Sequence, residues 1–282
     1  MTDSIGNRRR IGVCSWSLRP ATARELAARV AECGVGHVQL ALGPIRSGAM
    51  PLGALRDALA AARVTACSGM MSTVGEDYSS LASIARTGGI RPDVHWAANV
   101  AIAKADARLA RELGLPLVTF HAGFLPHGAD DPERAKLLVR LRTIVDVFAD
   151  EGVRLGFETG QETAATLLEF LSDLDRTRAG VNFDPANMIL YGMGDPVAAL
   201  RELGPRVVQV HVKDALPAAR RGEWGEEVPV GTGMVDWRAF FAALDAVQPG
   251  VDLMIEREAG EQRVDDVRRA RSLVASLTGA AV

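Results

Sequence analysis

Short apolar runs alternate along the chain with longer segments in which apolar residues recur at helical spacing. Eight of the short runs have the length and β-branched content of strands, and they lie at residues 10–16, 37–43, 63–69, 117–123, 154–160, 179–185, 207–213 and 251–257. Helical periodicity is clearest at residues 21–33, 104–114, 133–152, 163–174, 236–247 and 264–277. Strands that alternate with helices form parallel βαβ units, and eight of them in 282 residues predict an α/β fold, a closed (β/α)8 TIM barrel that forms a single domain over residues 1–282.

The later strands separate their side chains onto an apolar face and a mixed face. The apolar face carries Leu155, Phe157, Val181, Phe183, Val208, Val210, Val251, Leu253 and Ile255. The mixed face carries Arg154, Gly156, Glu158, Asn182, Asp184, Val207, Gln209, His211, Asp252, Met254 and Glu256. Side chains of a barrel alternate between the helix-covered outside and the interior, so we expect the mixed face to point inward. Its strands end in polar residues at the carboxyl edge, where enzymes with this fold keep their active sites.

Four of those strand ends carry side chains that bind metals: Glu158, Asp184, His211 and Glu256. Each one alone is explained as a solvated residue at the end of a strand. Three carboxylates at one barrel mouth would raise one another's pKa unless a cation lay between them, so the four in register predict one divalent metal ion. Oxygen ligands with one imidazole favour Mn²⁺, Mg²⁺ or Co²⁺, and Zn²⁺ is compatible with them.

Four further residues are candidates for contact with a substrate. His121 ends the fourth predicted strand with inward parity, and a structural hydrogen bond explains it equally well. Lys213 either holds a substrate hydroxyl or pairs with Asp214 or a neighbouring loop. Asn187 either contacts the substrate or caps a turn. Trp16 either forms a wall for a sugar ring or belongs to the packing at the barrel top.

Two connections, 70–95 and 216–235, are long enough to serve as lids over a site. The second holds candidate contact residues between glycines that permit hinge motion: Trp224, Glu226 and Glu227. We expect it to close over the substrate, with an oligomer contact as the alternative. Its GTG sequence at 231–233 resembles a phosphate-binding loop, although a tight turn before a helix that starts at Asp236 explains it better.

Composition and charge narrow the choice of partner. Charged residues make up 24% of the chain, hydrophobic ones 48%, and the formal net charge of −3 gives no reason to expect a nucleic acid. No apolar run reaches the roughly 18 residues of a membrane span. The cysteines lack metal-type spacing, and the N-terminal sequence MTDSIGNRRR has no apolar signal segment, so we expect a reduced, cytoplasmic protein. A small, near-neutral molecule is the expected partner, and homo-oligomerisation is left open.

Several short stretches resemble those of a known family: FHAG (120–123), GFETG (156–160), VNFDPANM (181–188), VHVKD (210–214), VPVGTGMVDW (228–237) and MIERE (254–258). The chain is similar to the sugar phosphate isomerase/epimerase group of xylose-isomerase-like barrels, which includes ketose 3-epimerases, inosose dehydratases and hydroxypyruvate isomerases. This resemblance implies that Glu158, Asp184, His211 and Glu256 are metal ligands. It also implies that the two glutamates act as acid and base.

Such a constellation supports proton transfer next to a carbonyl group. A divalent ion acidifies the α C–H bond of a sugar or polyol-derived ketone and stabilises an enediolate. Two carboxylates on opposite faces then give epimerisation, return of the proton to the adjacent carbon gives isomerisation, and loss of a β-hydroxyl gives dehydration. Ketose 3-epimerases usually carry a histidine where Asn187 falls and an arginine where Pro217 falls, and the HVKD form looks more like the isomerase and inosose dehydratase branch. An inosose-dehydratase-like lyase is therefore the alternative.

Two other classes fit less well. Endonuclease IV shares this barrel but uses additional histidines for three zinc ions, whereas this chain has five histidines in all and no basic excess. A sugar-binding barrel without catalysis is the third alternative, and the presence of both Glu158 and Glu256 argues against it.

Overall fold

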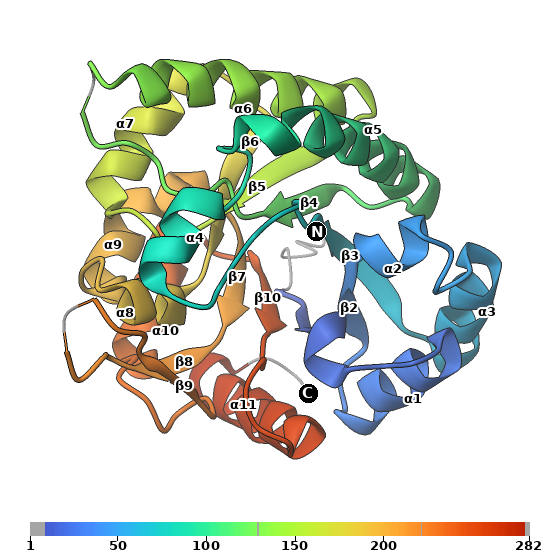
Figure 1. Cartoon of the computed structure of the whole chain (residues 1–282). Helices are drawn as coiled ribbons and strands as arrows, with labels where there is room; N and C mark the ends of the chain where they lie inside the picture. The colour runs from blue at the N-terminus through green and yellow to red at the C-terminus, as the bar shows by residue number, and fades with distance from the viewer. Residues whose placement is uncertain (1–8, 129, 221, 280–282) are drawn as a thin grey trace, which may run out of the picture.

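The computed structural model describes residues 9–128, 130–220 and 222–279, which form a closed barrel of eight parallel strands (Figure 1). Around the barrel the strands follow the order β1-β10-β7-β6-β5-β4-β3-β2. Their bounds are β1 Ile11–Cys14, β2 His37–Ala41, β3 Thr65–Met70, β4 Leu117–Phe120, β5 Arg154–Glu158, β6 Ala179–Phe183, β7 Val207–Val212 and β10 Asp252–Ile255. Each lies on one of the eight predicted runs, so the predicted TIM barrel is confirmed.

Helices surround the barrel in Figure 1. They are α1 Ala23–Glu32, α2 Leu42–Arg46, α3 Leu52–Ala62, α4 Leu81–Thr87, α5 Trp96–Leu113, α6 Pro132–Asp150, α7 Ala164–Leu174, α8 Pro185–Tyr191, α9 Pro196–Leu203, α10 Trp237–Val247 and α11 Arg263–Thr278. Single 3-10 turns lie at Ser15–Leu18, Asp93–His95 and Gly204–Arg206. Within the described ranges, no helix combines the length and the apolar character that crossing a membrane requires.

Most of the described α-helices begin where the sequence supplies a capping side chain. The side chains of Thr22, Asp131, Thr163 and Asp236 each accept a hydrogen bond from a backbone N–H of the first helical turn, which satisfies a donor that the helix itself leaves free. Asp184 does the same at the start of α8, where Pro185 follows it. The barrel strand β6 therefore passes directly into a helix at the edge where the site lies.

The two long connections contain structure that the sequence pattern did not predict. Segment 70–95 includes α4 and the 3-10 turn Asp93–His95, and α5 starts well before residue 104. Segment 216–235 includes most of a two-stranded antiparallel hairpin, formed by β8 Asp214–Leu216 and β9 Glu226–Val228. These additions lie on the loops that follow β3 and β7.

The predicted alternation of faces in the later strands holds, except at a bulge in β7; among the earlier strands the register also shifts in β3, where Cys67 is the extra residue. Val207 pairs with Val181 and Gln209 with Asn182, so Val208 is an extra residue in the strand. A Cβ atom on Gly180 would lie 2.5 Å from Val208 Cγ1, so Val208 fills the space beside an inward-facing glycine. The prediction that Val207 faces inward and Val208 outward is therefore wrong. From Gln209 onward the predicted alternation is correct.

Uncharged polar side chains fill the barrel beneath its carboxyl edge. Ser68 Oγ donates to Gln209 Oε1 at 2.6 Å, and Gln209 Nε2 donates to Asn182 Oδ1 at 3.2 Å. Asn182 Nδ2 lies 3.0 Å from His211 Nε2. All four residues are buried, so these polar groups are satisfied by one another rather than by solvent. The network supports His211 from below.

Candidate active site

Four neighbouring strands bring the predicted metal ligands together. Glu158 ends β5, Asp184 follows β6, His211 lies in β7 and Glu256 follows β10. Each residue offers a ligand atom, and these atoms all lie within 4.8 Å of one another. His211 Nδ1 is 3.3 Å from Glu158 Oε1, 3.2 Å from Glu256 Oε2 and 3.9 Å from Asp184 Oδ2. The four residues, called the tetrad below, are buried.

One atom of each tetrad residue is buried without a hydrogen-bond partner: Glu158 Oε2, Asp184 Oδ2, His211 Nδ1 and Glu256 Oε2. Burying a polar atom without a hydrogen-bond partner costs folding free energy. Four such atoms close together indicate that a single bound group compensates for all of them. A cation among them satisfies all four, because three are carboxylate oxygens and the fourth is an imidazole nitrogen. The tetrad therefore fits a divalent metal ion.

Gln39 of β2 orients His211 for this role. Gln39 Nε2 donates to the carbonyl oxygen of Gly69 at 3.3 Å and to Thr119 Oγ1 at 2.8 Å, which turns Gln39 Oε1 toward His211 Nε2 at 2.8 Å. Gln39 Oε1 only accepts and Asn182 Nδ2, 3.0 Å from the same nitrogen, only donates, so the shorter contact, to Gln39, favours the tautomer with its proton on Nε2. The lone pair of Nδ1 then faces the carboxylates, as a metal ligand requires.

Burial and mutual repulsion perturb the carboxyl groups of the tetrad. Burial raises the pKa of Asp184 well above its ordinary value, and repulsion from Glu256 and Glu158 adds to this effect against the attraction of Lys213. Burial also opposes the ionisation of Glu256, but Lys213 and His211 hold its pKa well below the ordinary value. The three carboxylates thus compete for the positive charge available to them, and a bound cation removes that competition.

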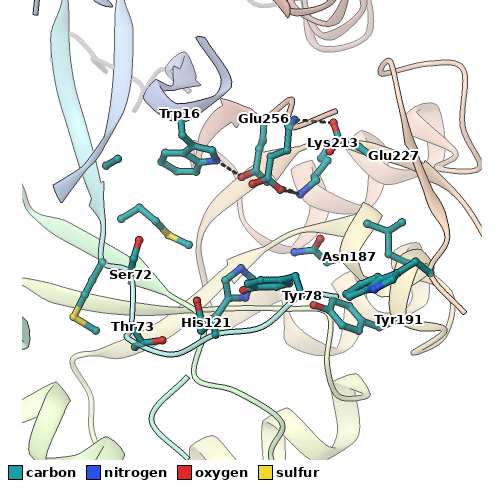
Figure 2. A pocket seen from close by; sticks show the side chains of 17 residues that line it. Trp16, Ser72, Thr73, Tyr78, His121, Asn187, Tyr191, Lys213, Glu227 and Glu256 are labelled. Carbon is teal, nitrogen blue, oxygen red and sulfur yellow. Dashed lines mark hydrogen bonds and ion pairs between the residues drawn. The ribbon is translucent and has the colours of Figure 1, made fainter. Parts of the chain in front are cut away.

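A cavity of about 540 Å³ opens above the tetrad, and the four predicted contact residues line it (Figure 2). They are Trp16, His121, Asn187 and Lys213. Glu256 also reaches the cavity directly, and Trp16 Nε1 donates to its Oε1 at 2.6 Å. The structure brings all eight predicted site residues together, and their roles stay predictions.

Glu158 lies immediately behind two residues of the cavity wall. Asn187 Nδ2 donates to Glu158 Oε1 at 3.0 Å, and His121 Nε2 is 3.5 Å from Glu158 Oε2. The cap of α8 is Asp184, to which the backbone N–H of Asn187 donates, so the side chain of Asn187 takes no part in the cap and instead donates to Glu158 at the cavity wall. Asn187 is therefore not the capping residue of this turn.

Lys213 is buried among carboxylates. Its Nζ is 2.7 Å from Glu258 Oε2, 3.1 Å from Glu256 Oε2 and 4.0 Å from Asp184 Oδ2. Although burial opposes the charge, these carboxylates raise the pKa of Lys213 well above its ordinary value. Of the two alternatives for a structural pairing, Asp214 is wrong and the loop that follows β10 is correct.

Asp214 instead holds the turn that follows the hairpin. Its Oδ2 accepts from the backbone N–H groups of Gly231 at 2.8 Å and Gly233 at 3.2 Å, and from Trp237 Nε1 at 3.0 Å. Its Oδ1 accepts from the N–H groups of Ala215 and Val235. The GTG sequence is thus a turn wrapped around a carboxylate. A Cβ atom on Gly233 would lie 2.2 Å from Asp214 Oδ1, which explains the glycine.

The hairpin contributes two residues to the cavity wall, Trp224 and Glu227. Glu227 Oε1 accepts from Arg257 Nη1 at 2.7 Å and from the backbone N–H of Glu258 at 2.9 Å. Strand β9 is therefore fixed to the loop after β10. Closure of the 216–235 segment over a substrate remains a prediction, and it concerns the part between β8 and β9. Arg221 in that part lies outside the described residues.

The sequence matches the model of one protein family over residues 27–277, described as a xylose isomerase-like TIM barrel. The chain belongs to this family. A xylose isomerase domain protein from Planctomyces limnophilus is 33% identical with a TM-score of 0.83, over 96% of both chains. Comparison with curated proteins found no significant match.

Two further structures share the fold at lower identity. A D-allulose 3-epimerase from Methylomonas sp., solved in complex with D-allulose, is 18% identical with a TM-score of 0.72, over 96% of this chain and 97% of that one. A xylose isomerase-like TIM barrel protein from Mycobacterium smegmatis, in complex with magnesium, is 18% identical with a TM-score of 0.73, over 97% of this chain and 98% of that one.

Sequence reasoning missed four residues of the site: Gln39, Tyr78, Tyr191 and Glu258. Gln39 carried a usable signal, because it has inward parity in a predicted strand. Tyr78, Tyr191 and Glu258 line the cavity from loops and from α8, where no strand periodicity indicates direction.

Proposed function

We propose that the protein is a metal-dependent carbohydrate epimerase or isomerase that moves a proton through an enediolate. The observation that carries this proposal is the tetrad, with its four unpaired buried atoms, beneath a cavity of about 540 Å³. Glu158, Asp184, His211 and Glu256 would hold one Mn²⁺, Mg²⁺ or Co²⁺ ion, with Zn²⁺ also compatible. When bound, such an ion polarises a substrate carbonyl and makes the neighbouring C–H bond more acidic.

The two glutamates are suited to move the proton. They lie on two sides of His211, with contacts of 3.3 Å for Glu158 and 3.2 Å for Glu256. Asn187 holds Oε1 of Glu158 and Trp16 holds Oε1 of Glu256, so Oε2 of each is left without a hydrogen bond. Both carboxylates are thus fixed in orientation. Their Oε2 atoms lie beside cationic or imidazole groups, with Glu158 Oε2 3.5 Å from His121 Nε2 and Glu256 Oε2 3.1 Å from Lys213 Nζ, and each is suited to exchange a proton with a substrate.

The proposed reaction balances without any further reactant. One glutamate takes the proton from the carbon next to the carbonyl, the C–H electrons form a C=C bond, and the carbonyl π electrons move onto oxygen. The other glutamate, which enters the step as a carboxylic acid, delivers its proton to the opposite face as the C=C electrons form the new C–H bond and the carbonyl re-forms. The carbon is inverted, and proton exchange with solvent restores both glutamates. Delivery to the adjacent carbon, together with movement of the hydroxyl proton to the former carbonyl oxygen, gives an aldose–ketose isomerase instead. Expulsion of a β-hydroxyl gives the dehydratase alternative, which Asn187 and Pro217 support because they depart from the ketose 3-epimerase pattern.

The candidate ligand groups of the described chain support a single ion. Two such groups are present, and they share His211 and Glu256. This overlap speaks against the three-zinc site of an endonuclease IV-like nuclease. We expect about one divalent ion per chain after loading with Mn²⁺, and a large loss of bound metal in His211→Ala and Asp184→Asn. Equal metal content in all three proteins would contradict the assignment.

Turnover in D₂O tests the proton transfer. We expect ketoses or keto-inositols, screened with added Mn²⁺, to acquire deuterium at the carbon next to the carbonyl. Glu158→Gln and Glu256→Gln should each lose at least about 10²–10⁴-fold in rate, because the amide is not a base. Glu261→Gln, which removes a carboxylate from an exposed side chain, serves as the control. Product without deuterium at early conversion would indicate a hydride shift, after single-base shielded transfer is excluded with labelled substrate.

A further inference from the structure

We infer that the cavity selects an uncharged, polyol-like carbohydrate and rejects phosphorylated or carboxylated analogues. This inference rests on the proposed function for its substrate class, but it concerns a property of the cavity wall that can be measured separately. Three observations support it: the charge of the cavity wall, the ion pairs of Lys213, and the occupation of the backbone N–H groups of the turn at 231–233 by the carboxylate of Asp214.

The charged residues of the described cavity wall are mainly acidic. Its glutamates are Glu76, Glu227, Glu256 and Glu258, and against them stands a single lysine, with no arginine. With one divalent ion bound, the tetrad keeps one net negative charge, because its three carboxylates outnumber the two positive charges. A phosphate or carboxylate group would therefore enter a region of like charge, which opposes binding.

The one lysine is already neutralised. Lys213 Nζ contacts Glu258 Oε2 at 2.7 Å and Glu256 Oε2 at 3.1 Å, and its side chain is only 5% exposed. An incoming anion would have to displace Glu258 to gain this cation. Glu227 is likewise paired, with Arg257, and Arg257 points its guanidinium at that glutamate and at Asp266. Neither cation is available to a ligand anion.

The backbone donors that would suit a phosphate are also occupied. Many TIM barrels bind phosphate with the loops after their last two strands. Here the loop after β7 supplies N–H groups from Gly231, Gly233 and Val235, and the carboxylate of Asp214 accepts from all three. In the loop after β10, the N–H groups of Glu258 and Ala259 donate to the carboxylate of Glu227. The positions where a phosphate would be expected therefore already hold the protein's own carboxylates.

The remaining wall suits an uncharged sugar. The rings of Tyr191 and Trp224 pack edge to face with centroids 5.0 Å apart, and Tyr78 lies in the cavity near His121 (Figure 2). Such rings cover the C–H faces of a carbohydrate, while Asn187 and the glutamates bind hydroxyl groups. The wall thus offers hydrogen-bond acceptors and aromatic faces but no free cation among its described residues.

Binding of non-reacting polyols tests the inference apart from catalysis. The Mn²⁺-loaded protein is titrated with D-glucitol, D-glucitol 6-phosphate and D-gluconate, and tryptophan fluorescence reports occupancy because Trp16 and Trp224 line the cavity. Inorganic phosphate at the same concentrations controls for removal of the metal. We expect D-glucitol to bind at least about 100-fold more tightly than either anion. Tighter binding of an anion, or no binding of D-glucitol, would overturn the inference.

A variant locates the source of the selectivity. Glu258→Gln leaves Lys213 with one fewer carboxylate, so the preference for D-glucitol over its phosphate should narrow by at least about tenfold. Glu261→Gln removes the same charge three residues along the chain, outside the cavity wall, and should leave the preference unchanged. Equal narrowing in both variants, or in neither, would contradict a role for the Lys213–Glu258 pair.

Proton exchange in D₂O separates this inference from the proposed function. The matched substrates are D-fructose with its 6-phosphate and D-ribulose with its 5-phosphate. Exchange that favours the phosphates would refute the inference and leave the proposed function intact. Tight binding of D-glucitol without exchange on any ketose would refute the proposed function and leave the inference intact.

Discussion

Replacement of Asp214 by asparagine should loosen the turn that carries the hairpin beside the cavity. The buried carboxylate accepts five hydrogen bonds, three at Oδ2 and two at Oδ1. The amide of Asp214→Asn has almost the same shape but only one accepting oxygen. The least costly arrangement places that oxygen at the Oδ2 position, and the NH₂ group then faces the N–H groups of Ala215 and Val235.

The size of the effect follows from those two donors. Both residues are buried, and each buried donor left without an acceptor costs about 1–3 kcal/mol, so the turn should lose about 2–6 kcal/mol. A domain of this kind is stable by about 5–15 kcal/mol in total. The variant should therefore fold, with local opening of residues 226–237 made easier by at least about 30-fold.

Amide hydrogen exchange measures this opening residue by residue. The N–H groups of Gly233 and Val235 should exchange at least about 30-fold faster in Asp214→Asn, while those of β5 and β6 should be little affected. Asp236→Asn is the matched control, because Asp236 is the exposed N-cap of α10 and asparagine caps a helix about as well as aspartate. Unchanged protection of Gly233 and Val235 in Asp214→Asn would refute the reasoning.

Three further predictions concern burial, metal affinity and close packing. Burial raises the pKa of Glu162 to about 8, so its contribution to stability is full at low pH and is lost as pH rises through 8. Glu162→Gln should therefore gain unfolding free energy relative to the wild type, by about 1.4 kcal/mol per pH unit between pH 5 and 8, as measured by urea unfolding. A difference between the two proteins that does not change with pH would contradict this. Gln39→Leu should weaken Mn²⁺ binding by about 10–100-fold in calorimetry, and unchanged affinity would show that Gln39 does not position His211. Gly233→Ala should cost about 1–3 kcal/mol because its Cβ would meet Asp214 Oδ1, whereas Gly53→Ala, with nothing within 4 Å of its Cβ, should not destabilise the protein.

The barrel and its tetrad were accessible from sequence because both depend on local pattern. A parallel barrel fixes the direction of every strand, so a polar residue at a strand's carboxyl end has a known destination. Glu158, Asp184, His211 and Glu256 converge for that reason alone. The same rule applied to strand 37–43 selects Gln39, which has inward parity. It was not predicted because an uncharged amide is neither a usual metal ligand nor an acid or base.

Other features depend on contacts between distant segments and could not be predicted from pattern. The bulge at Val208 arises where β7 passes Gly180, and a period-two count has no means to detect it. The position of Tyr78 depends on a loop that is held by contacts such as that of Glu76 Oε1 with the N–H of Gly89. Lys213 has the same parity whether it pairs with Asp214 or Glu258, and only the packed loops decide between them.

The tetrad and part of the cavity wall come from different halves of the barrel. The tetrad comes entirely from β5, β6, β7 and β10, which are neighbours in the sheet, whereas β1 to β4 and their loops supply Trp16, His121 and the wall formed by residues 70–78. Changes in the loop after β3 can therefore reshape the space offered to a substrate without moving a single tetrad residue. In evolutionary terms, a lineage with this layout can change part of the substrate wall through its first half and keep its tetrad in place, while Tyr191, Lys213 and Glu258 of the second half form the rest of that wall. For an engineer, residues 70–78 are accordingly the place to begin.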